Sequence, residues 1–167
     1  MSQHAPATQR AASTARLVDM IAALEGFTGE ADGGDWLVTR PYSGPKGRRQ
    51  VVIGQSRDGT VGTTGIAADH APTDDEWSVP CVILLTGEGG ETPEDCEAGV
   101  EAAFNAVADM LAHRPRLNLA GAPDLPGVYG ARCGAPSIEC AWSPGDPPVA
   151  TCAFDITLAC SIWRNPR

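Results

Sequence analysis

The sequence TCAFDITLACSIW occupies residues 151–163 and largely decides how the chain can fold. Apolar side chains alternate along it with small or polar ones, a period of two that is typical of a half-buried β-strand. The apolar set is Cys152, Phe154, Ile156, Leu158, Cys160 and Ile162. At ~3.3 Å per residue this stretch spans roughly 43 Å, whereas ordinary strands have about 5–6 residues. We therefore predict one unusually long final strand over residues 149–163; a kink that splits it into two ordinary strands is the alternative.

A second apolar strand is predicted over residues 76–89, EWSVPCVILLTGEG. One face of it carries Trp77, Val79, Cys81, Ile83 and Leu85. Val82 and Leu84 make the middle apolar on both sides, which indicates a central strand there. Pro80 has no amide hydrogen to donate, so that end is expected to be an edge or a bulge.

Residues 92–113 give the clearest helix. Thr92 suits the N-cap, Pro93 the first helical position, and Asp95 stands three residues after the cap. The residues at helical spacing are Cys96, Val100, Phe104, Val107 and Leu111. A helix of this extent is about 32 Å long, a match for a long sheet.

The remaining pattern completes an α+β domain. We predict a flexible tail over residues 1–12 and a single domain over 13–167 that begins with a helix at 14–25. Strands at 35–40 and 48–55 are expected to form a meander or hairpin around the turn residues 41–47. Residues 56–76 are predicted as a long loop, 117–136 as loop-rich, and 137–143 as a strand. The predicted fold is a mixed, mostly antiparallel sheet flanked by an N-terminal helix and one long helix, with a long C-terminal strand.

Composition argues against several classes of partner. The formal charge of −9 argues against binding to nucleic acid or to an anionic membrane, because phosphate recognition needs clustered Lys and Arg. No apolar run approaches the ~18 residues of a membrane span, and the first residues do not read as a signal peptide. The six cysteines are therefore expected to stay reduced in a cytoplasm.

Catalytic patterns are weak. His70 stands near Asp69, Asp74 and Asp75, which would suit a metal or acid–base cluster, but solvated loop charge is the favoured interpretation. The Gly-rich residues 59–65 lack the Lys that would reach a phosphate. We expect no catalytic residue, no cofactor and no metal site, and hence no enzymatic activity.

The long helix carries an acidic face opposite its apolar one. Its carboxylates are Glu94, Glu97, Glu101 and Asp109. An ordinary solvated face is the favoured interpretation. The alternatives are a surface that lines an acidic channel, or one that meets basic residues such as Arg48 and Arg49 of a neighbouring copy.

The order of these segments resembles the tail terminator, or tail completion, family of long-tailed bacteriophages. The matching pieces are TARLVDMIAALEG, two strands with a Gly-rich loop, WSVPCVILLTGEG, an acidic helix ending in MLAHRPRLNL, and the long final strand. The Pro/Gly-rich segment AGAPDLPGVYG departs from this pattern. The resemblance covers residues 14–163 and implies a mixed sheet flanked by helices, with no catalytic site.

The resemblance also implies a role and partners. It implies a homohexameric ring at the neck of the virion, assembled in the host cytoplasm, that caps the tail tube and stops its polymerisation. The ring would contact the major tail tube protein and the head–tail connector, while DNA passes through its lumen without specific binding. A connector or stopper, a minor tail protein, and a small metal- or ligand-binding enzyme are the alternatives.

Overall fold

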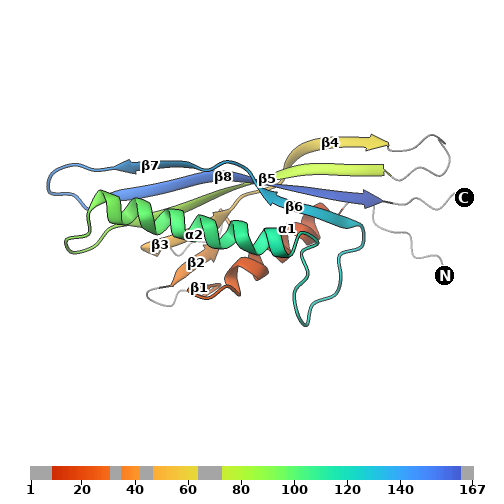
Figure 1. Cartoon of the computed structure of the whole chain (residues 1–167), viewed down its shortest axis with the longest axis horizontal. Helices are drawn as coiled ribbons and strands as arrows, with labels where there is room; N and C mark the ends of the chain where they lie inside the picture. Colours follow the sequence, from red (N-terminus) through yellow and green to blue (C-terminus); the bar gives the residue numbers. More distant parts are fainter. Residues whose placement is uncertain (1–8, 31–34, 42–46, 64–72, 163–167) are drawn as a thin grey trace, which may run out of the picture.

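The computed structural model of the protein describes residues 9–30, 35–41, 47–63 and 73–162. Within these residues the chain forms two helices and one eight-stranded sheet (Figure 1). The helices are α1 (Arg10–Ala22) and α2 (Pro93–His113). The strands are β1 (Phe27–Thr28), β2 (Trp36–Thr39), β3 (Arg49–Ile53), β4 (Arg57–Thr63), β5 (Thr73–Thr86), β6 (Val128–Cys133), β7 (Ser137–Ala141) and β8 (Val149–Ile162). The α+β class, the mixed and mostly antiparallel sheet and the two flanking helices agree with the prediction.

The two longest strands, β5 and β8, run antiparallel along the whole molecule. They pair from Thr73–Ile162 to Thr86–Val149 without a register shift, so β8 is one strand and the predicted alternative of a kink is wrong. On the outer edge of β5, β3 is followed by β4; on the outer edge of β8, β7 and β6 lie at opposite ends (Figure 1). The pair therefore forms the spine to which the other strands are added.

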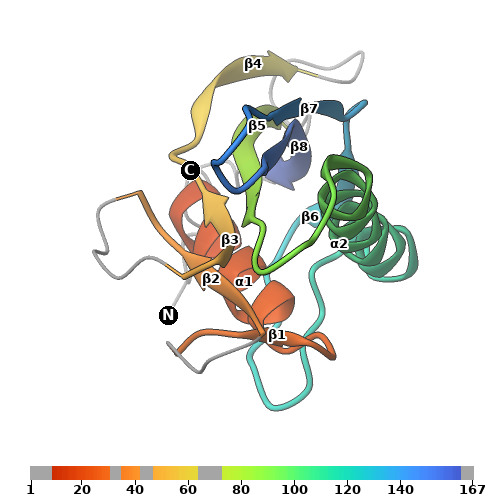
Figure 2. The same ribbon diagram turned by 90° about the vertical axis from the view of Figure 1, so that its left-hand side faces the viewer.

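Only one face of this spine is buried. The side chains on that face are Asp75, Trp77, Val79, Cys81, Ile83 and Leu85 from β5, and Ala150, Cys152, Phe154, Ile156, Leu158 and Cys160 from β8. On the opposite face, every side chain from Glu76 to Thr86 and from Thr151 to Ser161 is half-buried or exposed. Both helices pack on the buried face: α2 contacts β5 and β8, and α1 contacts β1 and β2 (Figure 2).

The sequence of α2 explains its position. The Thr92 hydroxyl accepts a bond from the Asp95 amide at 3.2 Å, and the Asp95 carboxylate accepts one from the Thr92 amide at 3.1 Å, which forms the predicted capping box. The predicted apolar stripe is buried against the sheet. Phe104 meets Phe154 of β8 edge to face, with ring centroids 5.0 Å apart, so the helix is fixed over the middle of the spine.

α1 begins four residues earlier than predicted, so the expected tail over 1–12 is too long. Its first residue, Arg10, donates from Nη2 to Asp75 Oδ1 at 2.7 Å and from Nε to Asp75 Oδ2 at 3.2 Å. The Arg10 guanidinium also lies 5.7 Å from the ring centroid of Trp77. Because Asp75 is only 3% exposed, this bidentate pair neutralises a buried carboxylate and draws the helix start onto β5.

The pairing of β2 with β3 corrects the sequence analysis. Turn residues at 41–47 predicted a meander or hairpin, yet the two strands are parallel, with Val38 opposite Val51. A strand of four residues spans roughly 13 Å, and the nine-residue connection can extend about 30 Å, so the chain has length enough to return and run in the same direction. The turn residues therefore predicted where the first strand ends, but not whether the two strands pair parallel or antiparallel.

The predicted loop at 56–76 is also wrong in large part, because β4 and the start of β5 occupy both of its ends; residues 64–72 lie outside the described residues. β6 was missed within the segment 117–136.

Pro80 does not lie on an edge of the sheet. It pairs with Asp155 on β8, and on the other side of β5 it lies between the part that pairs with β3 and the part that pairs with β4. Its carbonyl accepts the Gly54 amide at 2.7 Å, and a Cβ at Gly54 would lie 2.7 Å from Pro80 Cγ. Pro80, which has no amide hydrogen, therefore lies opposite the gap between β3 and β4 on that edge of β5.

The Arg10–Asp75 pair makes the first prediction. Arg10→Ala is expected to lower the free energy of unfolding by about 2 kcal/mol, because it removes the two charge-assisted hydrogen bonds that Arg10 makes to a buried carboxylate. Adding Asp75→Asn should recover part of that loss, because a neutral amide costs less to bury than a charge. Urea unfolding measures both, with the exposed Arg132→Ala as a control that should stay within about 0.5 kcal/mol of the parent. Equal stability of the parent and Arg10→Ala would show that the pair contributes nothing.

Candidate assembly surface

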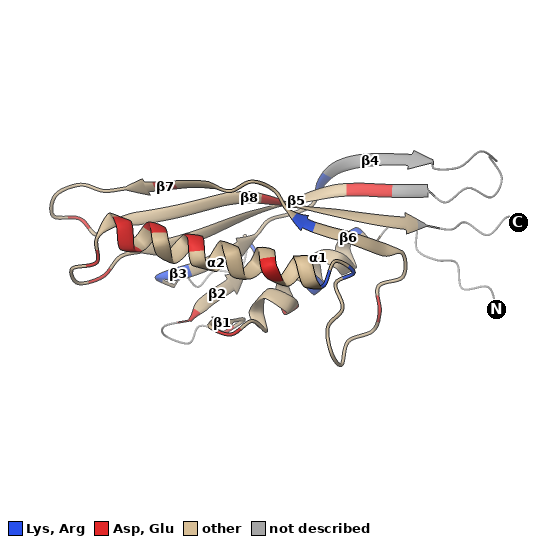
Figure 3. Ribbon diagram, viewed as in Figure 1, with Lys and Arg blue, Asp and Glu red and all other residues tan. Residues whose placement is uncertain are grey.

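The outer face of α2 carries the predicted acidic residues. Glu94, Glu97, Glu101 and Asp109 are all exposed and follow one another along the side of the helix that points away from the sheet (Figure 3). Among the described residues none of the four takes part in an ion pair within the chain. Glu97 and Glu101 stand four residues apart, a spacing at which like charges repel by a few tenths of a kcal/mol.

The acidic face also acts on a neighbouring strand. Burial raises the pKa of the Cys140 thiol on β7, and the charges of Glu97 and Glu94 raise it further. The first half of the acidic face therefore lies close enough to β7 for its field to be felt there.

Arg48 and Arg49 are the predicted basic partners for this face; Arg49 begins β3 and Arg48 directly precedes it. Arg48 donates from Nη2 to Glu91 Oε1 at 2.8 Å, and its Nε lies 3.5 Å from Glu88 Oε2. The Arg49 guanidinium lies 5.9 Å from the ring centroid of Trp36. Both arginines are thus engaged with residues of their own chain, and their role between copies stays a prediction.

The sheet face that no helix covers holds a row of polar side chains that sequence analysis did not find. Cross-strand pairing places Arg57, Ser78, Thr157 and Arg132 side by side across β4, β5, β8 and β6. Glu76 and Asp155 stand in the adjacent rows, so the charges here are of both signs. The row becomes visible only when the strand register is known, because its members lie up to 100 residues apart in the sequence, from Arg57 to Thr157.

The structure describes only part of the cluster that the enzyme hypothesis requires. No group of three or more His, Cys, Asp and Glu side chains is placed to hold a metal ion among these residues. His70 and Asp69, the centre of the enzyme hypothesis, lie outside the described residues. Asp75 is buried in its pair with Arg10, which corrects the expectation that it is solvated loop charge.

All six cysteines are free, and four of them are buried. Burial raises the pKa of Cys81, Cys96 and Cys152, and it raises the pKa of Cys133 to about 12. Buried thiols whose pKa is raised pack as small apolar groups and are poor nucleophiles.

Comparison with known proteins identifies a similar solved structure but no related sequence. No protein-family model and no curated protein matches the sequence. Among solved structures, a chain of the virion of a native gene transfer agent (GTA) particle is similar, with 17% identity over 87% of this chain and 93% of that chain and a TM-score of 0.43. A match at this identity and TM-score assigns neither a family nor a role to the chain.

Neither of the helices in the described residues is both long and apolar enough to cross a membrane.

The ion pair of Arg48 generates a pH-dependent prediction. The Glu88 amide and then the Arg48 guanidinium hold the pKa of Glu91 below its ordinary value of 4.5. The stability that this carboxylate contributes is therefore present above that value and is lost as pH falls through the lowered pKa of the folded state. Arg48→Ala should raise the pKa of Glu91 part of the way back, as measured by NMR titration of the side-chain carboxyl carbon. The exposed Arg116→Ala is the control, and an unchanged Glu91 pKa in Arg48→Ala would contradict the assignment.

Proposed function

We propose that the protein is a structural component of a phage-like virion: a tail terminator that forms a ring on the end of the tail tube. The observation that carries this proposal is the one-sided burial of the β5–β8 spine. Fourteen residues of each strand are paired, yet the helices cover only one face. A subunit of a closed ring needs two different surfaces that meet in a head-to-tail contact, and a sheet with one open face and one helix-covered face supplies two such surfaces.

The charge distribution supports a lumen through which DNA passes. The acidic face of α2 repels phosphate, so DNA would slide past it without being held. The net charge of −9 acts in the same direction over longer distances. In this proposal α2 lines or borders the channel, and the major tail tube protein and the head–tail connector bind the two rims of the ring at the neck of the virion.

The order of the elements further supports this assignment over an enzyme. An N-terminal helix, short strands, a long strand, a capped acidic helix, two further short strands and a long final strand follow one another, an order similar to the one on which the tail terminator resemblance is based. A connector or stopper of the head–tail joint is the alternative within the same particle. It would share the ring but would bind the head side rather than the free end of the tube.

Electron microscopy of the purified protein, alone and mixed with tail tubes, tests the proposal. We expect rings, six-membered by the family resemblance, that bind the ends of tubes and stop tube protein from adding there. Rings that bind only head connectors would favour the stopper. A protein that stays monomeric in the presence of both would overturn the proposal.

The acidic face of α2 gives a separate prediction. Glu97→Lys, Glu101→Lys and Asp109→Lys together should leave folding and rings intact, because all three side chains are exposed, but should slow DNA ejection by attracting phosphate. Ejection is measured as release of labelled DNA from assembled particles. Asp124→Lys, an exposed change in the connection after α2, is the matched control. If particles with the triple variant eject DNA as fast as wild-type particles, the acidic face is ordinary surface charge with no role in DNA passage.

A further inference from the structure

The outer edge of β6 and β7 is a sheet edge that no other described strand covers. Both strands pair with β8 alone and run antiparallel to it, one after the other, with a short break at 134–136 (Figure 1). Among the described residues, no backbone hydrogen bond outside these ladders ties 130–133 or 137–141 to another element. The N–H and C=O groups along such an edge are a ready site for a further strand.

The side chains of this edge are arranged about a single centre. Tyr129, in the bulge of β6, is 50% exposed, and Trp142, directly after β7, is 61% exposed. Arg132 and Glu139 are also exposed, and the strand registers place both on the sheet face that no helix covers. The aromatic pair and the charged pair are each centred on the point between residues 135 and 136.

A two-fold rotation about this centre, with its axis perpendicular to the sheet, places β6 of one copy antiparallel to β7 of a second copy. Arg132 then stands opposite Glu139 of the second copy, and Tyr129 stands opposite Trp142. Each contact occurs twice, because a two-fold contact is reciprocal. Opposite charges and aromatic side chains that face one another across neighbouring strands stabilise their pairing.

The backbone groups of β6 have the direction that this register needs. In an antiparallel ladder, alternate residues direct both their N–H and their C=O to the same neighbouring strand. The Gly134 amide donates to the Asp155 carbonyl of β8 at 2.7 Å. Counting back from Gly134, Ala131 and Cys133 therefore direct their backbone groups outward, away from β8.

The backbone groups of β7 match them. Along β8, the residues that alternate with Asp155 pair with Ser137 and Glu139, so these two bond inward and Ile138 and Cys140 point outward. The two-fold register brings Ile138 opposite Cys133 of the second copy, and Cys140 opposite Ala131. Outward groups thus meet outward groups at both positions, which lets a hydrogen-bonded ladder form between the copies.

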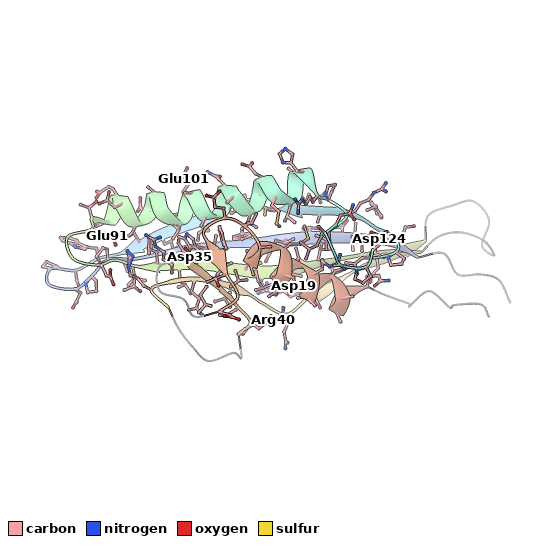
Figure 4. All side chains as sticks on the ribbon, turned by 90° about the horizontal axis from the view of Figure 1, so that it is seen from below. Asp19, Asp35, Arg40, Glu91, Glu101 and Asp124 are labelled. Carbon is pink, nitrogen blue, oxygen red and sulfur yellow. The ribbon has the colours of Figure 1, made fainter. Side chains whose placement is uncertain are left out.

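α2 runs beside this edge, with its start near β7 and its end near β6. It contacts both strands, and Figure 4 shows it along one side of the molecule, with Glu91 before its start and Asp124 beyond its end. The start lies near β7, because the first carboxylates of the helix raise the pKa of Cys140 there. The end lies near β6, because Pro115 and Arg132 border the same hollow.

The two ends of α2 carry opposite charges. Glu94 and Glu97 are exposed at its start, and Arg114 and Arg116 are exposed just after its end. Within the described part of the chain none of these four side chains takes part in an ion pair. The two-fold rotation turns the helix end for end, so the acidic start of one helix comes to lie on the side of the basic end of the other. The antiparallel helix dipoles favour the same arrangement.

We propose that two copies of the chain join through the outer edges of β6 and β7 into a two-fold dimer with one continuous sheet. The surface is an edge, separate from the two sheet faces that supply the contacts of the proposed ring, so this inference does not depend on the ring function. In the dimer each copy covers the open edge of the other. The free subunit is thereby protected from pairing with unrelated strands.

Charge reversal tests the proposed register. Arg132→Glu creates two like-charged pairs across the contact and is expected to raise the dissociation constant of the dimer roughly tenfold. Adding Glu139→Arg restores opposite charges and should return the constant to near the parent value. Sedimentation velocity over a dilution series measures both, and circular dichroism confirms that each variant is folded. Arg57→Glu, an exposed change of the same charge at the opposite edge of the sheet, is the matched control and should dimerise as the parent does.

The aromatic pair gives a second variant. Trp142→Ala removes the side chain that faces Tyr129 of the other copy, and it should also weaken the dimer, because aromatic side chains in such contacts carry much of the binding energy. The same dilution series measures the effect.

The outcomes separate this contact from the ring. A parent protein that stays monomeric at every concentration would overturn the edge contact, and so would a dimer that Arg132→Glu leaves unchanged. A dimer that Arg132→Glu weakens but the double reversal does not restore would overturn it as well, because the register would be wrong. Since the contact is two-fold, it doubles the mass of single subunits and of closed rings alike. Doubling without any rings would therefore count against the ring function alone, and rings without doubling against the edge contact alone.

Discussion

The antiparallel ladder between β5 and β8 determines where every other described element can stand. The two strands that form its fourteen residue pairs are separated in sequence by α2, β6 and β7. The ladder therefore forms only when the chain returns over the length of the molecule. β3 and β4 take their register from β5, and β6 and β7 take theirs from β8. Loss of register by one residue would move the whole apolar set of a strand to the open face, which makes the alternating pattern of both strands the main constraint on the fold.

One-sided burial follows from that pattern and separates two kinds of surface. On the covered side, α1 and α2 share a single core with the sheet, and the outward face of α2 is left acidic. On the uncovered side, small, apolar and oppositely charged side chains lie together. The Arg10–Asp75 pair and the capping box of Thr92 fix the starts of the two helices. Rigid helix positions are useful in an assembly, because each contact between copies must recur with the same geometry.

Much of this arrangement could be read from local sequence, and the failures have physical causes. β5, α2 and β8 were predicted because strong periodicity and capping residues act over short distances. β4 and β6 were missed because Gly62 and Gly130 and their polar neighbours resemble loop sequence, although edge strands tolerate them. The parallel pairing of β2 with β3 depends on contacts made elsewhere in the fold. The candidate site divides in the same way: the acidic face follows from helical spacing, whereas the pair of Arg10 with Asp75 spans 65 residues and has no local signal.

Burial of the cysteines affects how readily their thiols are oxidised in air. Strand alternation turns Cys81, Cys152 and Cys160 toward the core, where they fill space as small apolar groups. Oxidation and cross-linking proceed through the thiolate, which burial suppresses at Cys81 and Cys152. These side chains are therefore slow to form disulfides in air as long as the chain stays folded. Resistance to air would then be a by-product of core packing rather than a separate adaptation.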